Sequence, residues 1–286
     1  MPDVTIRQAT LSDAAACGAV CYSAFSAINA EHNFPCDFPG PEVALGVMNL
    51  MFGHPRFYCV VAEINGRVVG SNCLDERSVI AGVGPITIDP GVQNHRVGRK
   101  LMQAVMDRAL QRGAPGVRLV QAAFHNRSLA LYSSLGFDVR EPLSCLQGRT
   151  TQRQLPGCSV RPAQASDLPA CNALAMQIHG FDRAHELADG VQVGSAMVVE
   201  RGGRLTGYAS SLAFFGHAAA ETNLDLQALL ASADSFGGSG ILLPSRNANL
   251  LRWCLSNGLR VVQPMTLMSF GLYNQPQGAW FPSITF

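Results

Sequence analysis

The residues best placed to do chemistry lie in the stretch IDPGVQNHRVGR, from Ile88 to Arg99. His95, Arg96 and Arg99 surround Gly98, and no acidic residue follows the Asp-Pro-Gly turn. An amphipathic helix begins within this stretch, and the first turn of a helix has backbone N–H groups without intrahelical partners. With the positive end of the helix dipole, such a turn binds phosphate readily. His95, Arg96, Arg99 and Lys100 are expected to add donors or charge there, and Gly98 to leave room for a phosphate against the backbone. The alternative is an ordinary strand–turn–helix connection with a solvated basic turn.

A second candidate is Tyr132, within HNRSLALYSSLGF. The pattern predicts a short helix that starts near Asn126 and is stopped by Gly136. A tyrosine on a short helix is more often a packed aromatic than a catalytic group, and Asn126 can serve simply as the helix N-cap. Taken alone, this stretch leaves both interpretations open.

Hydrophobic periodicity and turn residues predict the elements that hold these candidates. Asn65-Gly66 is the strongest hairpin signal in the chain. The first half is expected to contain strands at 4–10, 56–64, 67–76, 83–89, 116–124 and 137–148, and helices at 14–28, 42–53, 97–111 and 126–136.

The second half repeats the first in three blocks. IRQATLSDAAAC aligns with VRPAQASDLPAC, VVAEINGRVVG with MVVERGGRLTG, and LALYSSLGFDVREP with LRWCLSNGLRVVQP. Three blocks in the same order indicate a duplicated domain. They predict a first domain at 1–148, a linker at 149–158 and a second domain at 159–286. The second copy has GHAAAETNLDLQALLASA where the first carries its basic loop, so the phosphate site is expected once per chain.

Composition narrows the classes of partner. The chain has 286 residues, 48% of them hydrophobic, and a formal net charge of +1, so no global charge draws it to nucleic acid or to an anionic membrane. No apolar run is expected to reach the roughly 18 residues that span a bilayer, and no secretory signal is evident. The nine cysteines are expected as buried free thiols, which favours a reducing cytoplasm and no metal site. The aromatic C-terminal stretch is expected to cover a sheet edge rather than to reach over the first domain.

From about residue 4 to 147, the order of strand, Asp-Pro turn, QNHRVG, helix, strand and HNRSLALYSSLGF resembles the GNAT superfamily of acyl-CoA-dependent N-acyltransferases. The family's loop is usually written Q/R-x-x-G-x-G/A, and Arg96 stands at its first glycine here. The resemblance implies an α/β protein with two GNAT-like domains, each a mixed, mostly antiparallel sheet flanked by helices. The second domain is expected to be degenerate and without cofactor.

The resemblance also assigns roles to residues. It gives Tyr132 the general-acid role toward the leaving thiolate. It places acyl-CoA against Ile88, Gln93, Asn94, His95, Arg96, Val97, Gly98, Arg99 and Asn126. No general base is evident in the third strand, so Asp75, Glu76 or a chain of water molecules remains open for that role.

The expected activity is that of an N-acetyltransferase. It would move acetyl from acetyl-CoA, or another short acyl group from its CoA ester, to a primary amine of a small molecule by direct attack on the thioester. The alternative is a non-catalytic acyl-CoA-binding regulatory module. The second domain is expected to serve structure, homodimer contact or substrate shaping.

Overall fold

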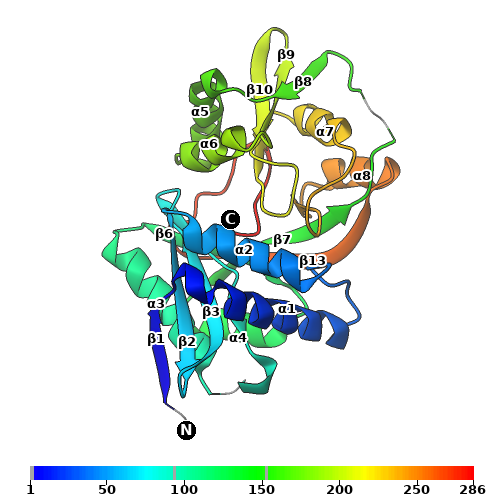
Figure 1. The fold of residues 1–286 in the computed structure, drawn as a ribbon. Helices are drawn as coiled ribbons and strands as arrows, with labels where there is room; N and C mark the ends of the chain where they lie inside the picture. The colour runs from blue at the N-terminus through cyan, green and yellow to red at the C-terminus, as the bar shows by residue number, and fades with distance from the viewer. Residues whose placement is uncertain (1–2, 93–94, 152–153) are drawn as a thin grey trace.

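The computed structural model describes residues 3–92, 95–151 and 154–286. The chain forms two sheets flanked by helices, an α/β fold (Figure 1). The first half contributes β1 (Val4–Gln8), α1 (Ala14–Glu31), α2 (Pro41–Gly53), β2 (Phe57–Ile64), β3 (Arg67–Asp75), β4 (Ile80–Val83), β5 (Thr87–Ile88), α3 (Val97–Gln111), β6 (Gly116–Ala122), α4 (Asn126–Ser134) and β7 (Asp138–Gln147).

The second half repeats nearly the same order of elements, which supports the predicted duplication. It contributes β8 (Cys158–Pro162), α5 (Leu168–His179), α6 (Ala184–Gln192), β9 (Met197–Arg201), β10 (Arg204–Ala209), β11 (Ala218–Ala220), α7 (Asn223–Ser232), β12 (Ile241–Pro244), α8 (Ala248–Ser256), β13 (Arg260–Gly271) and β14 (Ala279–Phe281).

The hairpin predicted at Asn65-Gly66 is confirmed. It joins β2 and β3 in an antiparallel pair, and both turn residues have positive φ, at 50° and 75°. The second copy makes the same turn between β9 and β10 with Gly202 and Gly203, at 60° and 77°. Asn and Gly tolerate this left-handed backbone, so the local chemistry of the turn fixes the hairpin in both copies.

An ion-pair triad of aligned residues occurs in both copies. In the first, the Arg7 guanidinium lies 2.7 Å from both Asp13 and Glu63. In the second, Arg161 lies 2.7 Å from Asp167 and 2.6 Å from Glu200. Each triad ties the first strand of its copy to the following helical turn and to the neighbouring strand, so the sequence repeat corresponds to a structural repeat.

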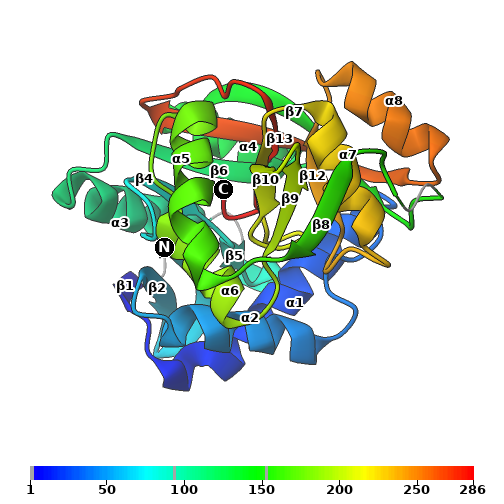
Figure 2. The same cartoon turned by 90° about the horizontal axis from the view of Figure 1, so that it is seen from above.

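The two halves exchange strands where they meet. Part of the first sheet runs β6–β13–β7–β12, and every pair in this run is antiparallel. β13 of the second half therefore lies between β6 and β7 of the first, and β7 lies between β13 and β12 (Figure 2). Strands from both sides of residues 149–158 are hydrogen-bonded in one sheet. The predicted linker there therefore stays a prediction about where the duplicated sequence units meet.

The strand predicted over 83–89 is broken in two. β4 ends at Val83, and only Thr87 and Ile88 resume strand pairing, as β5. Pro85, between them, has no N–H to donate to a ladder, which explains why pairing stops there. β4 is the strand that joins β3 to β6, so the connection between these two strands ends where β4 ends.

Of two expectations about the chain ends, one is corrected and the other is met. Residues Leu11–Glu31 form a helix that is long and apolar enough to cross a bilayer, so the expectation that no run reaches that length is wrong. This helix packs against α2 and buries Cys17 and Cys21, as core helices do.

At the other end of the chain, β14 pairs with β11 at an edge of the second sheet, as expected. The following residues continue onto the first sheet, where the Thr285 carbonyl oxygen lies against Gly82.

Candidate functional site

The helix predicted over 97–111 is confirmed as α3. Its first intrahelical bond runs from the Lys100 N–H to the Arg96 carbonyl, at 3.1 Å. The N–H groups of Val97, Gly98 and Arg99 precede that bond and have no acceptor within the helix. The helix start is therefore the donor-rich turn that the sequence predicted. Gln93 and Asn94 lie outside the described residues.

Arg96 is the N-cap of α3 and has a left-handed backbone, with φ 59° and ψ 14°. This is the position at which the resemblance places a glycine. The loop therefore keeps the glycine-type turn although the side chain has changed, which costs about 1–2 kcal/mol relative to an unstrained residue. The guanidinium adds positive charge at the end of the helix where the dipole already favours an anion.

Gly98 serves close packing. A Cβ atom built there would lie 3.0 Å from Ile88 Cδ1 and 3.3 Å from Leu131 Cδ2. The glycine thus lets α3, β5 and α4 meet, and it is buried. The sequence argument had given it the role of leaving room for a phosphate, whereas the structure shows that it first brings the loop against the strand and the short helix.

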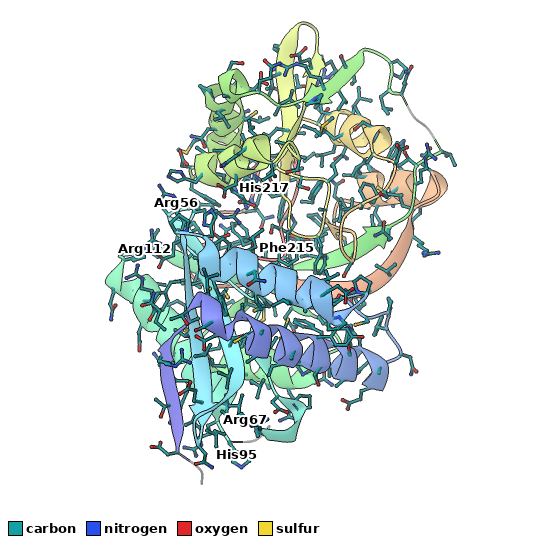
Figure 3. All side chains as sticks on the ribbon, in the orientation of Figure 1. Arg56, Arg67, His95, Arg112, Phe215 and His217 are labelled. Carbon is teal, nitrogen blue, oxygen red and sulfur yellow. The ribbon has the colours of Figure 1, made fainter. Side chains whose placement is uncertain are left out.

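The basic side chains around the loop differ in where they point. Arg99 Nη2 donates to Ser134 Oγ of α4 at 2.6 Å. His95 Nδ1 lies 3.0 Å from the Val92 carbonyl oxygen, and its ring stands at the outer end of the loop (Figure 3). Lys100 instead donates to the Val4 carbonyl of β1, at 2.8 Å, so it does not add to the loop's charge as the sequence suggested.

A gap opens in the sheet beside this loop. β4 and β6 pair in parallel only as far as Val83 and Leu119. Beyond that point β5 pairs with β3, and within the described residues no pairing joins β5 to β6. Backbone groups on facing strand edges that do not bond each other need other partners. An extended chain carrying amide groups has the donors and acceptors that such strand edges lack.

Tyr132 lies on α4 and is 5% exposed, in the core that α3 and α4 form on the sheet. Burial raises the pKa of its hydroxyl to about 12, and an interaction with the Ser128 hydroxyl opposes that rise. A tyrosine with this pKa stays protonated at neutral pH, which a proton donor requires. Its ring centroid lies 6.3 Å from that of Phe137, so it is also a packing residue.

Asn126 is the first residue of α4, and the N-cap position belongs to His125. The expectation that Asn126 is the cap is therefore wrong by one residue. In the second copy the corresponding cap is Asn247, whose side-chain oxygen accepts from the Leu250 N–H at 3.3 Å. His125 instead places Nδ1 2.7 Å from Ser128 Oγ. Sequence reasoning missed this contact, although the spacing of three residues signals it.

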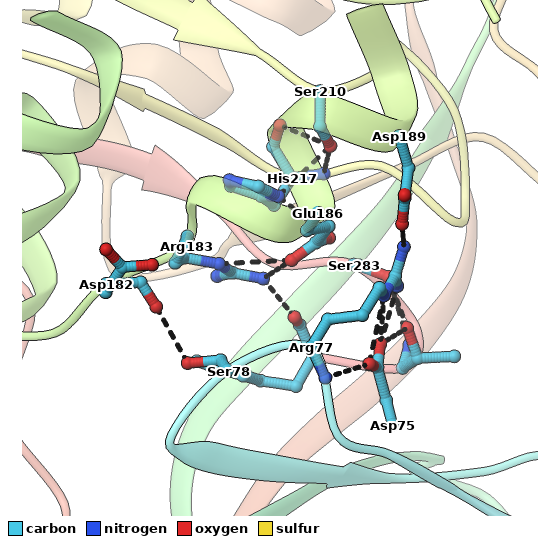
Figure 4. Close-up of polar contacts among 12 residues, drawn as sticks. Asp75, Arg77, Ser78, Asp182, Arg183, Glu186, Asp189, Ser210, His217 and Ser283 are labelled. Carbon is cyan, nitrogen blue, oxygen red and sulfur yellow. Dashed lines mark hydrogen bonds and ion pairs between the residues drawn. The ribbon is translucent and has the colours of Figure 1, made fainter. Parts of the chain in front are cut away.

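The two carboxylates considered as bases are held in ion pairs. Asp75 lies 2.5 Å from Arg77, which also reaches Asp189 of the second half at 3.1 Å (Figure 4). Glu76 accepts from Arg108 at 2.8 Å. Both carboxylates therefore form ion pairs with arginines.

The corresponding helix start in the second copy, at α7, carries a carboxylate of the chain itself. Asp225 in the first turn of α7 accepts from the Thr222 N–H at 3.1 Å and from Arg201 at 2.9 Å. This carboxylate therefore lies at the helix start, where its negative charge would repel an external anion. This agrees with a phosphate site in the first copy alone.

Comparison with known proteins agrees with these features. Residues 25–137 match the model of the acetyltransferase (GNAT) family. The first half of the chain therefore carries a GNAT acetyltransferase domain. A 54-residue segment is 43% identical to the mycothiol acetyltransferase of Brachybacterium faecium, and the match covers 19% of this chain and 16% of that protein. A match this short does not show that the two proteins share a substrate.

Solved structures with the same fold cover both halves of the chain. A candidate acetyltransferase from Pyrococcus horikoshii aligns with a TM-score of 0.73 at 16% identity, over 96% of this chain and 91% of the other. A GCN5-related N-acetyltransferase from Sphaerobacter thermophilus gives 0.64 at 14% identity, over 96% and 98%. A tandem GNAT protein from the clavulanic acid biosynthesis pathway gives 0.53 at 14% identity, over 94% and 98%. At these identities the likeness shows the fold alone.

The described residues contain no group of three or more His, Cys, Asp or Glu side chains able to hold a metal ion. The family's cosubstrate is acetyl-CoA, and the residues present fit it. The basic turn at Arg96 and Arg99 suits a pyrophosphate, and the gap between β5 and β6 suits an amide-bearing arm.

Proposed function

We propose that the protein transfers an acetyl group from acetyl-CoA to a primary amine of a small molecule, by direct attack of the amine on the thioester. The observation that carries this proposal is a basic helix start that adjoins an open sheet edge and a buried, protonated tyrosine. These are the parts that an acyl-transfer site needs: an anchor for the carrier, donors for the developing oxyanion and an acid for the leaving group.

Each part has named residues. The first turn of α3, with Arg96 and Arg99, holds the pyrophosphate. The backbone at Ile88 bonds the pantetheine arm and orients the acyl carbonyl, whose developing negative charge it stabilises through N–H donation. Tyr132 donates its hydroxyl proton to the thiolate that leaves. Asn126, at the exposed start of α4, faces the same arm.

The amine must lose a proton during the reaction. Because Asp75 and Glu76 are held in ion pairs, water molecules that reach bulk solvent are the proposed acceptor of that proton. The nine cysteines are free thiols, which favours work in the reducing cytoplasm and makes this location part of the proposal.

Release of CoA thiol in the presence of a panel of primary amines tests the activity. Thiol release that depends on an amine, with acetylated product identified by mass spectrometry, is the expected result. The control is the same enzyme without amine, which measures thioester hydrolysis alone. Tight CoA binding with no amine-dependent release across the panel would favour the regulatory binding module instead.

A further inference from the structure

A segment of the first half crosses the gap between β5 and β6. α1 runs across the strands of the first sheet and packs against β3 and β5 (Figure 1). The residues after α1 then reach Phe124, two positions past the end of β6. There the Phe34 ring stacks on Phe124 with centroids 4.1 Å apart, and the His32 ring lies 5.2 Å from it. Residues 32–38, here named the crossing segment, therefore span the gap on one face of the sheet.

The crossing segment lies on the face of the sheet opposite to α3. Val61 of β2 packs in one cluster with α1 and with Phe38 of the segment, whereas Val60 and Ala62 pack in the cluster with α3. Neighbouring residues of a strand point to opposite faces, so α1 and α3 cover opposite faces. Tyr132 packs in the cluster of α3. A carrier anchored at the start of α3 therefore leaves the α1 face of the gap for the amine.

The second half of the chain holds the crossing segment through one carboxylate. Asp37 Oδ1 accepts from Gln263 Nε2 of β13 at 2.8 Å and from Ser239 Oγ at 2.9 Å. Asp37 Oδ2 accepts from Asn29 Nδ2 of α1 at 3.1 Å. Gln263 and Asn29 are each 2% exposed, so both donors are fixed inside the protein. Asp37 therefore ties the end of α1 to a strand and a turn of the second half.

This anchor lies beside the aromatic contact. The Ala123 N–H donates to the Pro264 carbonyl oxygen at 3.0 Å, which carries the antiparallel pairing of β6 and β13 one residue past β6. Gln263 precedes Pro264 and Phe124 follows Ala123, so Gln263 and Phe124 are neighbours across the two strands. The polar anchor and the aromatic contact of the crossing segment are therefore held by adjacent positions, one from each half.

Within the described residues, the second copy has no counterpart of this segment. Its helices α5 and α6 are joined by residues 180–183, whereas α1 and α2 are joined by residues 32–40. The longer connection occurs in the copy that also has the basic helix start and Tyr132. The crossing segment is thus a feature of the copy to which the chemistry is assigned.

We propose that the second half fixes the amine side of the site through Asp37, a positioning residue that sets the crossing segment over the gap. The inference rests on the proposed function. Asp37 acts through the Phe34–Phe124 contact, whose aromatic faces then meet the amine acceptor in one arrangement. A segment that is already ordered spares the acceptor the entropy of ordering it. Binding of the amine therefore depends on hydrogen bonds donated by the second half.

Two variants in the second half weaken the anchor and leave the crossing segment unaltered in sequence. Ser239→Ala deletes one donor, and Gln263→Met keeps the length of the side chain and deletes the other. Each should raise the KM for the amine about threefold to tenfold, the range that one ordinary hydrogen bond is worth. CoA affinity, and kcat at saturating amine, should stay at the wild-type value. Ser235→Ala, at an exposed serine four residues before Ser239, is the matched control and should behave as the wild type.

A nitroxide spin label on Cys36 reports on the segment independently of turnover. Cys36 precedes Asp37, and of the nine cysteines, all within the described residues, it alone is exposed. The label should become more mobile in Ser239→Ala and Gln263→Met than in the wild type or Ser235→Ala. Labelled Cys36→Ser measures the background from other thiols.

The two readouts together decide the inference. A raised amine KM with a more mobile label supports it, and Ser239→Ala should then add little to the effect of Asp37→Ala, because both act on one contact. An immobile label in both variants would show that the second half does not hold the segment. A mobile label with a wild-type amine KM would show that the segment does not serve the amine. In both of these cases thiol release continues and the proposed function stands, whereas a wild-type protein that releases no thiol with any amine overturns that function and the role of Asp37 with it. If Gln263→Met does not fold, Ser239→Ala, at a half-buried turn residue, carries the test.

Discussion

Replacing Tyr132 with Phe removes one hydroxyl and keeps the ring. The ring projects from α4 into the core that also contains residues of α3, and it lies beside Phe137. Phe fills the same space, so the free energy of unfolding should change by less than about 1 kcal/mol. The variant therefore isolates the chemistry of the hydroxyl from its structural contribution.

The size of the rate loss follows from the pKa of this hydroxyl. Burial raises it to about 12, whereas a thiol such as that of CoA has a pKa near 8.5. Complete proton transfer to the thiolate is then uphill by about 3.5 units, or roughly 5 kcal/mol. In the transition state the proton is therefore only partly transferred, and the hydroxyl stabilises the developing charge by about 1.5–3 kcal/mol, the range for a hydrogen bond to a charged group. That range corresponds to a loss of roughly 10-fold to 150-fold in kcat.

The assay is steady-state release of CoA thiol, together with CoA affinity by calorimetry and the melting temperature. We expect a lower kcat with unchanged affinity and melting temperature. We also expect the wild-type activity to keep its acid up to about pH 11, because a group with a pKa near 12 loses its proton only above that range. A variant with the wild-type rate and a lower melting temperature would identify Tyr132 as a structural aromatic.

Arg96→Glu combined with Arg99→Glu should weaken CoA binding at least tenfold, because carboxylates would face phosphate; unchanged affinity in calorimetry would remove the loop from the site. One CoA should bind per chain, and a titration that reaches two equivalents would contradict the role given to Asp225 at α7. Burial lowers the pKa of His217 to about 4. Between pH 6.5 and pH 4 this histidine is therefore protonated in the unfolded chain but neutral in the folded chain. Stability should be complete above pH 6.5 and fall by about 1–3 kcal/mol toward pH 4; a flat melting temperature over that window, or the same slope in His217→Asn, would disprove this.

Local signals predicted much of the fold because the physics behind them is local. Asn65-Gly66 specified its hairpin, since only residues that tolerate positive φ make that turn. The apolar stripe of α3 placed that helix over 97–111, because one face had to meet the sheet. The repeat was readable for a similar reason: the same turn and capping residues recur where the same elements begin and end.

The sequence also pointed to the basic loop through its residue types and to Tyr132 through the family resemblance, because both lie in short local motifs. It could not reveal that Arg96 has a left-handed backbone or that Gly98 packs closely against Ile88. It also could not reveal that β13 lies between β6 and β7. Nor could it show that Asp75 is committed to Arg77. These features depend on contacts between segments far apart in the chain, and such contacts are set by the packing of the whole molecule rather than by any local pattern.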